Sequence, residues 1–282
     1  MFRSVSVIIP TYNGLALLKT NLPAVFKLTR STDEVVIIDD ASTDSSVEWL
    51  ITEFNLQQRT QNENFGVWQS ETMPSMPIIT VIKNHKNLRF AASCNLAVSL
   101  ARYSLVLLLN NDVVPSPTLL DSLLPHFDDE TVFAVGCHEK EHNQNGISGG
   151  KNKLWFERGL FMHARADDFK TGSTAWVSGG SGLFDKTKWI ELGGFDVHFY
   201  PAYWEDVDLS FRAQKKGWQT LFEANALVDH NHESTNNDVF GQQRLQKVSW
   251  RNSRLFTWKH ATVSQRLAFL LWLPYHCSKL GW

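Results

Sequence analysis

Short apolar runs alternate with stretches of helical spacing along the first half of the chain. Runs of this kind, which predict buried strands, cover residues 5–9, 35–38, 78–82, 104–109 and 132–136. Apolar positions three and four residues apart predict helices, which cover residues 15–28, 43–54, 90–101 and a stretch that starts at 115–117. Strands that alternate with helices indicate βα units and a mostly parallel sheet, so the sequence predicts an α/β fold with helices on the faces of that sheet.

The pattern becomes mixed further along the chain. Residues 57–77 are polar and contain Pro74 and Pro77, which predicts a loop, and residues 138–153 predict a flexible excursion. After residue 175 the sequence predicts one helix over 205–216 and short strands around 220–222 and 226–228.

Polar groups follow three of the predicted strands at the point where each strand ends. These groups are Thr11, Tyr12 and Asn13, then Asp39 and Asp40, then Asn110, Asn111 and Asp112. Ligands of open α/β sheets bind outside the carboxyl ends of the strands. Three polar clusters on one such edge therefore predict a binding site rather than three unrelated loops.

The first two clusters offer hydrogen-bond acceptors and hydroxyls rather than a phosphate-binding loop. Neither G-x-G-x-x-G after the first strand nor G-x-x-x-x-G-K-[ST] is present, so a dinucleotide cofactor and a P-loop are unsupported. Asp39 or Asp40 is able to accept from the imide of uracil or thymine, or from ribose hydroxyls. The alternative is that one of them caps the following helix.

The third cluster is rich in oxygen ligands. Asp112 beside two asparagines suits Mg²⁺ or Mn²⁺ if phosphate oxygens of a ligand complete the coordination. The alternative is an Asx turn that leads into Pro115.

Composition narrows the class of protein. The chain has 282 residues and a net charge of −2, which argues against nucleic acid as a partner. Its 43% apolar and 20% charged residues are typical of a folded globular protein. The three cysteines show no metal or disulfide spacing, so we expect a reducing, cytoplasmic location. We expect neither a signal peptide nor a membrane-spanning helix.

Charge is distributed unevenly, because the segment 239–282 has no acidic residue. It contains seven basic residues, namely Arg244, Lys247, Arg251, Arg254, Lys259, Arg266 and Lys279. The first four are spaced as one helical stripe, and residues 267–273 form an apolar, tryptophan-bearing run before Pro274. Two interpretations stay open: the segment lies in the interface of an anionic membrane, or it packs on the acidic remainder of the chain.

Several motifs together resemble family 2 inverting glycosyltransferases. They occur in the family's order over residues 4–235, as SVIIPTYN (6–13), IIDDASTD (37–44), NLRF (87–90), NND (110–112), GGFD (193–196) and WEDVDL (204–209). Arg212, His230 and residues 234–235 continue the resemblance, which is strongest to the rhamnosyltransferase-like subgroup.

The resemblance implies a GT-A fold with a Rossmann-like sheet. It implies a catalytic domain over residues 1–238, with a nucleotide-sugar-binding half (1–115) and a mixed acceptor-binding half (116–238), followed by a helical segment over 239–282. Donor-binding residues would be Pro10, Thr11, Tyr12, Asn13, Asp39, Asp40, Arg89 and Asn111. Asp112, with His230, would bind a divalent metal, Mg²⁺ or Mn²⁺, that bridges the diphosphate. Many members have Asp at the position of Asn110, so Asp112 is the one carboxylate at this strand end.

The acceptor side of the site depends most on the resemblance. It implies that Asp206 is the catalytic base, which an inverting transfer requires because a sugar hydroxyl is a poor nucleophile. The alternative is that Asp206 only complements the helix dipole. Gly180, Trp204 and Glu205 are expected to contact the acceptor, Gly180 by a close backbone approach unless it forms only a tight turn.

The sequence therefore predicts an inverting glycosyltransferase that uses a UDP- or dTDP-linked sugar and a glycan or lipid-linked acceptor, in cell-surface polysaccharide synthesis. We expect it in the cytoplasm or at the inner face of the membrane. A non-catalytic nucleotide-sugar or glycan-binding module and a sugar nucleotidyltransferase are the alternatives. A nucleotidyltransferase usually needs a glycine-rich loop and an early basic residue, which residues 10–16 lack.

Overall fold

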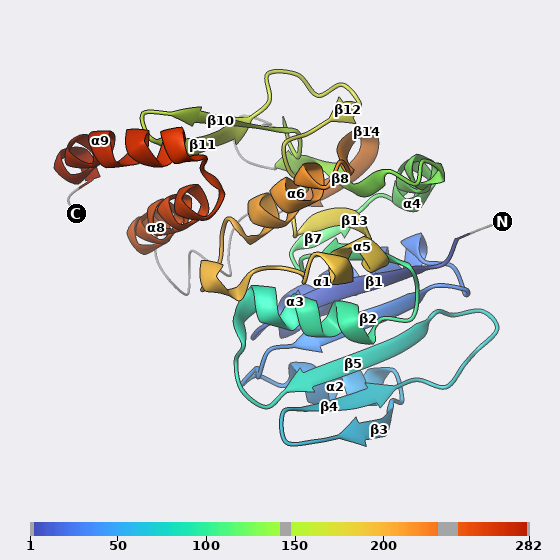
Figure 1. Cartoon of the computed structure of the whole chain (residues 1–282). Helices are drawn as coiled ribbons and strands as arrows, with labels where there is room; N and C mark the ends of the chain where they lie inside the picture. Colours follow the sequence, from blue (N-terminus) through green and yellow to red (C-terminus); the bar gives the residue numbers. More distant parts are fainter. Residues whose placement is uncertain (1–2, 142–147, 231–241, 281–282) are drawn as a thin grey trace.

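The computed structural model describes residues 3–141, 148–230 and 242–280. Residues 234–235, which continue the series of motifs, lie outside the described residues. Four parallel strands at the centre of a large sheet confirm the predicted βα pattern (Figure 1). In sheet order they are β6 (Leu105–Leu109), β1 (Val5–Thr11), β2 (Glu34–Asp39) and β5 (Ile78–Asn84).

The chain crosses this sheet in two directions from its first strand. It runs from β1 to β2 and β5 on one side, and then returns to β6 on the other side of β1. The strand order therefore reverses between β1 and β6, and their carboxyl ends define the place where an open sheet binds its ligand.

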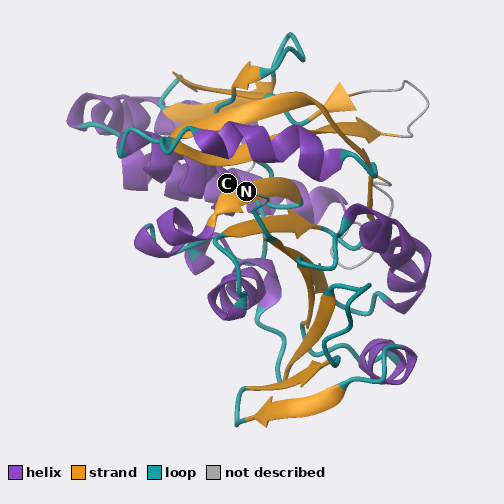
Figure 2. Ribbon diagram, turned by 90° about the vertical axis from the view of Figure 1, so that its right-hand side faces the viewer, coloured by secondary structure: helices purple, strands orange, loops and turns teal. Residues whose placement is uncertain are grey.

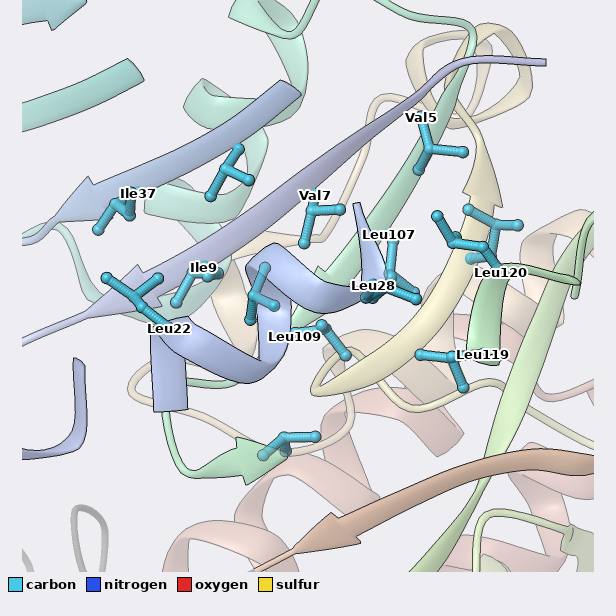
Figure 3. Packing of buried hydrophobic residues seen from close by; sticks show 14 of the residues in the cluster. Val5, Val7, Ile9, Leu22, Leu28, Ile37, Leu107, Leu109, Leu119 and Leu120 are labelled. Carbon is cyan, nitrogen blue, oxygen red and sulfur yellow. The ribbon is translucent and has the colours of Figure 1, made fainter. Parts of the chain in front are cut away.

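Alternate residues of the central strands supply the cores on the two faces of the sheet. Val5, Val7 and Ile9 of β1 belong to one cluster of buried residues, and Ile8 belongs to the other. Figure 3 shows the first cluster, where Leu22 and Leu28 pack among the strand residues. Period-two alternation with apolar residues on both faces explains why these strands appear in the sequence as continuous apolar runs.

Helices form at the predicted places and cover both faces of the sheet (Figure 2). The first cluster includes buried residues of α1 (Leu15–Leu28), α2 (Ser46–Glu53) and α4 (Leu119–Leu123). The second includes residues of α3 (Arg89–Leu100), α5 (Lys186–Glu191) and α6 (Glu205–Lys215).

The loop predicted over residues 57–77 is wrong in part. This stretch contains β3 (Gln57–Gln61) and β4 (Phe65–Gln69), a hairpin that extends the sheet beyond β5. All five residues of β3 are exposed, so it is an edge strand held by backbone pairing and has no apolar face to reveal it in the sequence.

The second half of the sheet is mixed, as expected. Next to β6 lie β13 (Ser181–Asp185), β8 (Val132–Glu141) and β14 (Gln219–His230), with β7 (Val113–Pro115), β9 (Ser148–Gly149) and β12 (Gly172–Ser173) at its margin. Two predictions need correction here. The predicted strands around 220–222 and 226–228 are one strand, β14, with a bulge between Phe222 and Leu227. The predicted excursion over 138–153 is wrong in part, because residues 138–141 belong to β8 and residues 148–149 to β9; residues 142–147 within it are not described.

The C-terminal helices join the second half through a third cluster of buried aromatic residues. Phe256 of α8 (Gln242–His260) packs in it with Phe161 of the hairpin β10 (Asn152–Glu157) and β11 (Leu160–Arg165), and with Trp204. Helix α9 (Val263–Leu280) follows, and it lies beside the same hairpin (Figure 1): a Cβ at Gly159, between β10 and β11, would lie 2.8 Å from Phe269 Cα. None of the helices described in the chain combines the length and apolarity needed to cross a bilayer.

Candidate active site

The strand ends of β1, β2 and β6 bring the three polar clusters to one edge of the sheet. Thr11 is paired in register with Asp39, and the Asp40 amide donates to the Thr11 carbonyl at 2.9 Å. Asn111 Nδ2 donates to Thr11 Oγ1 at 2.9 Å, which joins the end of β6 to the end of β1. Residues that are about 100 positions apart in the sequence thus meet because parallel strands end together.

One carboxylate oxygen of Asp39 has no hydrogen-bond donor. Its Oδ1 accepts from the Ser42 amide at 2.9 Å, whereas its Oδ2 is buried and has no hydrogen bond. Burial raises the pKa of Asp39. A buried acceptor without a donor is unfavourable, so a ligand that supplies an N–H or O–H here would be stabilised.

Asp40 has the opposite environment. Its Oδ1 accepts from Asn84, Ser93 and the Leu88 amide, and its Oδ2 accepts from the Arg89 amide at 2.7 Å. These bonds join the end of β2 to β5 and to the start of α3. Both carboxylate oxygens of Asp40 thus hold the protein's own chain, and a contact between Asp40 and a donor nucleotide stays a prediction.

The other predicted donor residues form the frame around Asp39. Asn13 Oδ1 accepts from the Thr43 amide at 2.7 Å, and the Asn13 amide donates to Ser42, so the two strand-end loops are joined. Pro10 and Tyr12 are half-buried. Arg89 has a left-handed φ of 70°. Its guanidinium lies 5.7 Å from the centre of the ring of Tyr200, a residue of the second half of the chain.

The end of β6 also meets the end of β14. Asp112 Oδ1 lies 3.4 Å from Nε2 of His230, the last described residue of β14. On the other side of the imidazole, Nδ1 lies 3.9 Å from Oε2 of Glu139 on β8. Burial acts to lower the pKa of His230, but the nearby carboxylates of Asp112 and Glu139 outweigh it and raise this pKa to about 9.

This pair of side chains fits a divalent cation. Asp112 Oδ1 is buried and has no hydrogen bond, and neighbouring ligands of an octahedral cation lie about 3 Å apart. In the described residues no group of three or more His, Cys, Asp and Glu side chains is arranged to hold a metal. Within the described part of the chain, Asp112 and His230 are therefore a pair of ligands that would need others to complete the coordination of a cation.

Sequence reasoning missed Glu139. It falls in the predicted excursion, where nothing in the spacing marks it, yet it is buried and accepts from Ser181 Oγ at 2.5 Å. Beside Ser181, the Gly180 carbonyl accepts from the Asn110 amide at 2.9 Å. A Cβ at Gly180 would lie 2.6 Å from Asn110 Nδ2, so a larger residue here would displace the Asn110 side chain.

Helix α6 carries the second pair of carboxyl groups at its first turn. Glu205 is buried, and its Oε2 has no hydrogen bond; burial and then the charge of Asp206 raise its pKa. Asp206 is half-buried, and burial raises its pKa as well, although hydrogen bonds from the Val207 and Gly179 amides oppose this. A carboxylate with a raised pKa is a stronger base than a free aspartate.

The aromatic residues before α6 differ from expectation. Trp204 is 3% exposed and lies inside the third cluster, so it offers no face to a sugar, which corrects its predicted contact with the acceptor. Tyr200 and Tyr203 are the exposed rings of this stretch, at 52% and 38%. Burial of Trp204 requires α8, because its indole donates to Ser249 Oγ at 3.3 Å.

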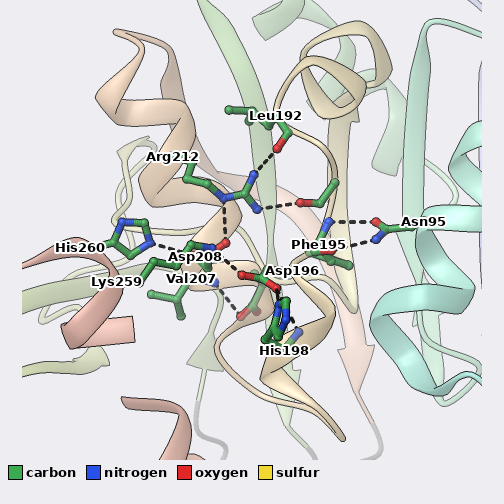
Figure 4. Close-up of polar contacts among 12 residues, drawn as sticks. Asn95, Leu192, Phe195, Asp196, His198, Val207, Asp208, Arg212, Lys259 and His260 are labelled. Atoms are coloured by element: carbon green, nitrogen blue, oxygen red, sulfur yellow. Dashed lines mark hydrogen bonds and ion pairs between the residues drawn. The ribbon is translucent and has the colours of Figure 1, made fainter. Parts of the chain in front are cut away.

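Asp208 anchors the same helix in a network that Figure 4 shows. It pairs with Arg212 at 2.7 Å, as the i, i+4 spacing predicts, and it also accepts from Lys259 and His260 of α8, both at 2.7 Å. Burial acts to raise the pKa of Asp208, but these partners outweigh it and lower the pKa. Arg212 in turn donates to the Leu192 and Gly194 carbonyls.

Fold and site together define a nucleotide-sugar-dependent glycosyltransferase of the GT-A class. The family model described as glycosyl transferase family 2 matches residues 6–188. The chain belongs to this family, and it is an inverting glycosyltransferase.

Two curated relatives of the chain are rhamnosyltransferases. The chain is 22% identical over 240 residues to the O-antigen chain rhamnosyltransferase RfbN of Salmonella typhimurium, covering 84% of this chain and 69% of the relative. It is 36% identical over 64 residues to the N-acetylglucosaminyl-diphospho-decaprenol L-rhamnosyltransferase of Mycobacterium tuberculosis, covering 22% of this chain and 20% of the relative.

Solved structures share the fold at low identity. GalNAc-T7 with UDP, GalNAc and Mn²⁺ has a TM-score of 0.63 at 17% identity, covering 82% of this chain and 44% of that one. The mannosyltransferase PcManGT from Pyrobaculum calidifontis with GDP-Man and Mn²⁺ has a TM-score of 0.61 at 16% identity, covering 99% and 76%. TarS 1–349 of S. aureus with UDP-GlcNAc has a TM-score of 0.56 at 14% identity, covering 98% and 73%.

Proposed function

We propose that this enzyme transfers a deoxyhexose from a dTDP- or UDP-linked donor to a lipid-linked glycan. Rhamnose is the deoxyhexose that we propose. The sugar is suggested by the two rhamnosyltransferase relatives. One observation supports the proposal most: carboxylate oxygens of Asp39 and Asp112 that have no hydrogen bond lie at one edge of the sheet. Glu205 and Asp206, in the first turn of α6, supply the second pair of carboxyl groups.

The donor is held by the first half of the chain. Asp39 Oδ2 accepts from the pyrimidine imide or from a ribose hydroxyl. Asn13, Thr11 and Asn111 keep the strand ends in register around the nucleotide. Asp40 contributes by fixing the start of α3.

Asp112 and His230 would hold the cation at the diphosphate. A bound divalent ion neutralises charge that builds on the leaving phosphate. His230 would give up its proton on becoming a ligand. The cation would then take the place of the positive charge that the imidazolium of His230 presents to Asp112.

Asp206 acts as the base. It accepts the proton of the attacking acceptor hydroxyl while the new bond forms to the anomeric carbon and the bond to the diphosphate oxygen breaks. The nucleoside diphosphate leaves with that electron pair, and attack from the opposite side of the sugar inverts the anomeric configuration. The raised pKa of Asp206 favours this role at neutral pH.

Helix α9 suggests where the acceptor is met. Its large side chains Val263, Leu267, Leu270 and Leu271 are 52–82% exposed, and Trp272 is 40% exposed. The segment that contains α9 has no acidic residue. An apolar helix face within a basic segment suits the interface of an anionic bilayer, which would bring the enzyme to an acceptor carried on a lipid.

The test measures nucleotide release from dTDP-rhamnose, UDP-glucose, UDP-N-acetylglucosamine and GDP-mannose, with Mn²⁺ and with or without N-acetylglucosaminyl-diphospho-polyprenol. We expect acceptor-dependent release of dTDP or UDP and a glycolipid product of inverted configuration. Binding of these donors without any release would support a non-catalytic binding module. Release of diphosphate from a nucleoside triphosphate and a sugar phosphate would support a nucleotidyltransferase.

A further inference from the structure

The segment that leads into α6 has a backbone that needs external support. Tyr203 and Trp204 are consecutive non-glycine residues with left-handed φ values of 72° and 79°. Such conformations persist only where the surrounding structure determines them. The first hydrogen bond of α6 runs from the Asp208 amide to the Trp204 carbonyl at 2.8 Å, so the course of this segment sets where α6, and with it Asp206, begins.

One side chain of α8 supplies most of that support. Asn252 is fully buried, and its Nδ2 donates to the carbonyls of Phe199, Ala202 and Tyr203 at 2.9, 2.9 and 2.8 Å. An amide NH₂ has two hydrogens, so one of them is shared between two carbonyls. The neighbouring Arg251 orients this amide by donating to Asn252 Oδ1 at 3.0 Å and binds the carbonyls of His198 and Tyr200.

The same helix holds α6 on the other side of Asp206. Lys259 and His260 bind Asp208, two residues beyond Asp206, and Lys259 also binds Asp196 at 2.6 Å (Figure 4). Helix α8 therefore fixes the chain both before and after the candidate base. It lies wholly outside residues 6–188, to which the family model extends.

We propose that Asn252 is a positioning residue for Asp206: by collecting three backbone carbonyls it holds the 199–204 segment in the one course that places Asp206 for proton abstraction. This rests on the proposed function of Asp206 as the base. Asn252 itself is buried within the protein and acts through the backbone, so it is assigned no contact with substrate.

The decisive variant is Asn252→Asp, which keeps the shape of the side chain but turns its donor into a second acceptor facing three carbonyls. Gln246→Glu is the matched control, because it makes the same amide-to-carboxylate change at an exposed position of α8. With the donor and acceptor that the wild type uses, we expect Asn252→Asp to lower kcat at least tenfold, with the donor KM and the calorimetric Kd of the nucleotide within about twofold of wild type. Gln246→Glu should behave as wild type.

Two further measurements separate positioning from general damage. In an Asp206→Asn background, adding Asn252→Asp should change the residual rate less than twofold, because the two positions act through one group. In hydrogen exchange, amides of residues 199–208 should exchange faster in Asn252→Asp and in Asn252→Ser, while amides of β1 and β2 keep their wild-type rates.

The outcomes are distinct. A kcat within twofold of wild type, a full tenfold effect that persists without Asp206, or unchanged exchange at residues 199–208 would each overturn the role of Asn252. If the wild type turns over no donor, or if Asp206→Asn is as active as wild type, the proposed function fails instead, and the exchange experiment still decides whether Asn252 holds the segment.

Discussion

Two aspartates on the first turn of α6 show how position decides the chemistry of one residue type. Asp206 has backbone amides as its hydrogen-bond partners and a raised pKa, whereas Asp208 is fully buried against Arg212, Lys259 and His260 and has a lowered pKa. The first suits a base that must accept a proton. The second suits a permanent anion that holds the helix in place.

Asp206→Asn should lower transfer at least 100-fold while leaving the nucleotide Kd nearly unchanged, because it removes a proton acceptor and no donor contact. It should also raise the thermal midpoint, by about 2 °C. A carboxyl whose pKa is raised by burial is penalised in its charged form at neutral pH, and the amide lacks that penalty. Calorimetry and rate assays on the same samples test both expectations, with Asp128→Asn, at an 82% exposed side chain, as the control.

The pH dependence of kcat is a second test of Asp206 as the base. Since the pKa of Asp206 is raised, kcat should fall on the acid side at a pH above the ordinary aspartate range of about 4. Residual activity of Asp206→Asn should lack that acid limb. Wild-type rates that stay level down to pH 4.5 would contradict the assignment of the base.

Asp112→Asn should weaken Mn²⁺ binding about tenfold or more, because it removes the one carboxylate of the proposed pair. Paramagnetic resonance of free Mn²⁺ measures this without turnover. The variant should also weaken the nucleotide Kd with Mn²⁺ present and leave it unchanged in EDTA. Full wild-type activity in excess chelator would exclude a metal as the stabiliser of the leaving group.

At the scale of elements, the two C-terminal helices separate the two interpretations that the sequence left open. Helix α8 packs on the body of the enzyme. Arg251, from the basic stripe, donates to the His198 carbonyl, and Lys259, one turn beyond the stripe, pairs with Asp196 and Asp208. Helix α9 contacts the β10–β11 hairpin through His276, which bonds the Arg158 carbonyl at 2.7 Å, and leaves its apolar face exposed. The membrane proposal therefore concerns α9.

Leu271→Glu should reduce co-sedimentation with vesicles of phosphatidylglycerol and phosphatidylcholine at least fivefold, since Leu271 is 82% exposed and a carboxylate there is repelled by the anionic surface. Its thermal midpoint should not change, because no buried contact is lost. Ser264→Glu, an exposed polar position of the same helix, is the control for charge alone. Equal vesicle binding by wild type and Leu271→Glu would remove the support for the membrane proposal.

At the scale of the whole molecule, buried charges join the catalytic half to the C-terminal helices. Asp208 is fully buried, and it connects α6 to Lys259 and His260 of α8. Asp196, a second partner of Lys259, also has its pKa lowered: burial acts to raise it, but Lys259 and His198 outweigh this. Both aspartates are charged in the folded state at pH values where free aspartates take up protons.

Asp208→Asn should lower the free energy of unfolding at pH 7 by about 3 kcal/mol, because it leaves buried cations without their counter-charge. The sign of the pH dependence follows from the lowered pKa. Above the ordinary aspartate pKa the stabilisation is fully present, and it is lost as the pH falls toward the folded-state pKa, since the unfolded chain binds the proton first. The difference between wild type and variant in urea unfolding should therefore shrink below about pH 4. A constant difference from pH 7 to pH 3 would mean that Asp208 acts by shape and not by charge.

The sequence by itself determined the central sheet, its flanking helices and the edge where the three polar clusters meet. Apolar runs and helical spacing are local properties, and the polar residues after each run mark the strand ends directly, as at Asp39 and Asp112. The exposed edge strand β3 escaped prediction because backbone pairing alone holds it, which leaves no apolar signal.

Only the tertiary structure decided what each of these polar groups does. Adjacent in sequence, Asp39 keeps an unused acceptor while Asp40 has none, because the donors to Asp40 come from residues 44–53 positions away. Trp204 is buried and Asn252 reaches three carbonyls for the same reason: α8 returns to the body some 50 residues later. Whether a polar atom has a hydrogen-bond partner depends on donors and acceptors from distant parts of the chain. The local sequence pattern does not contain that information.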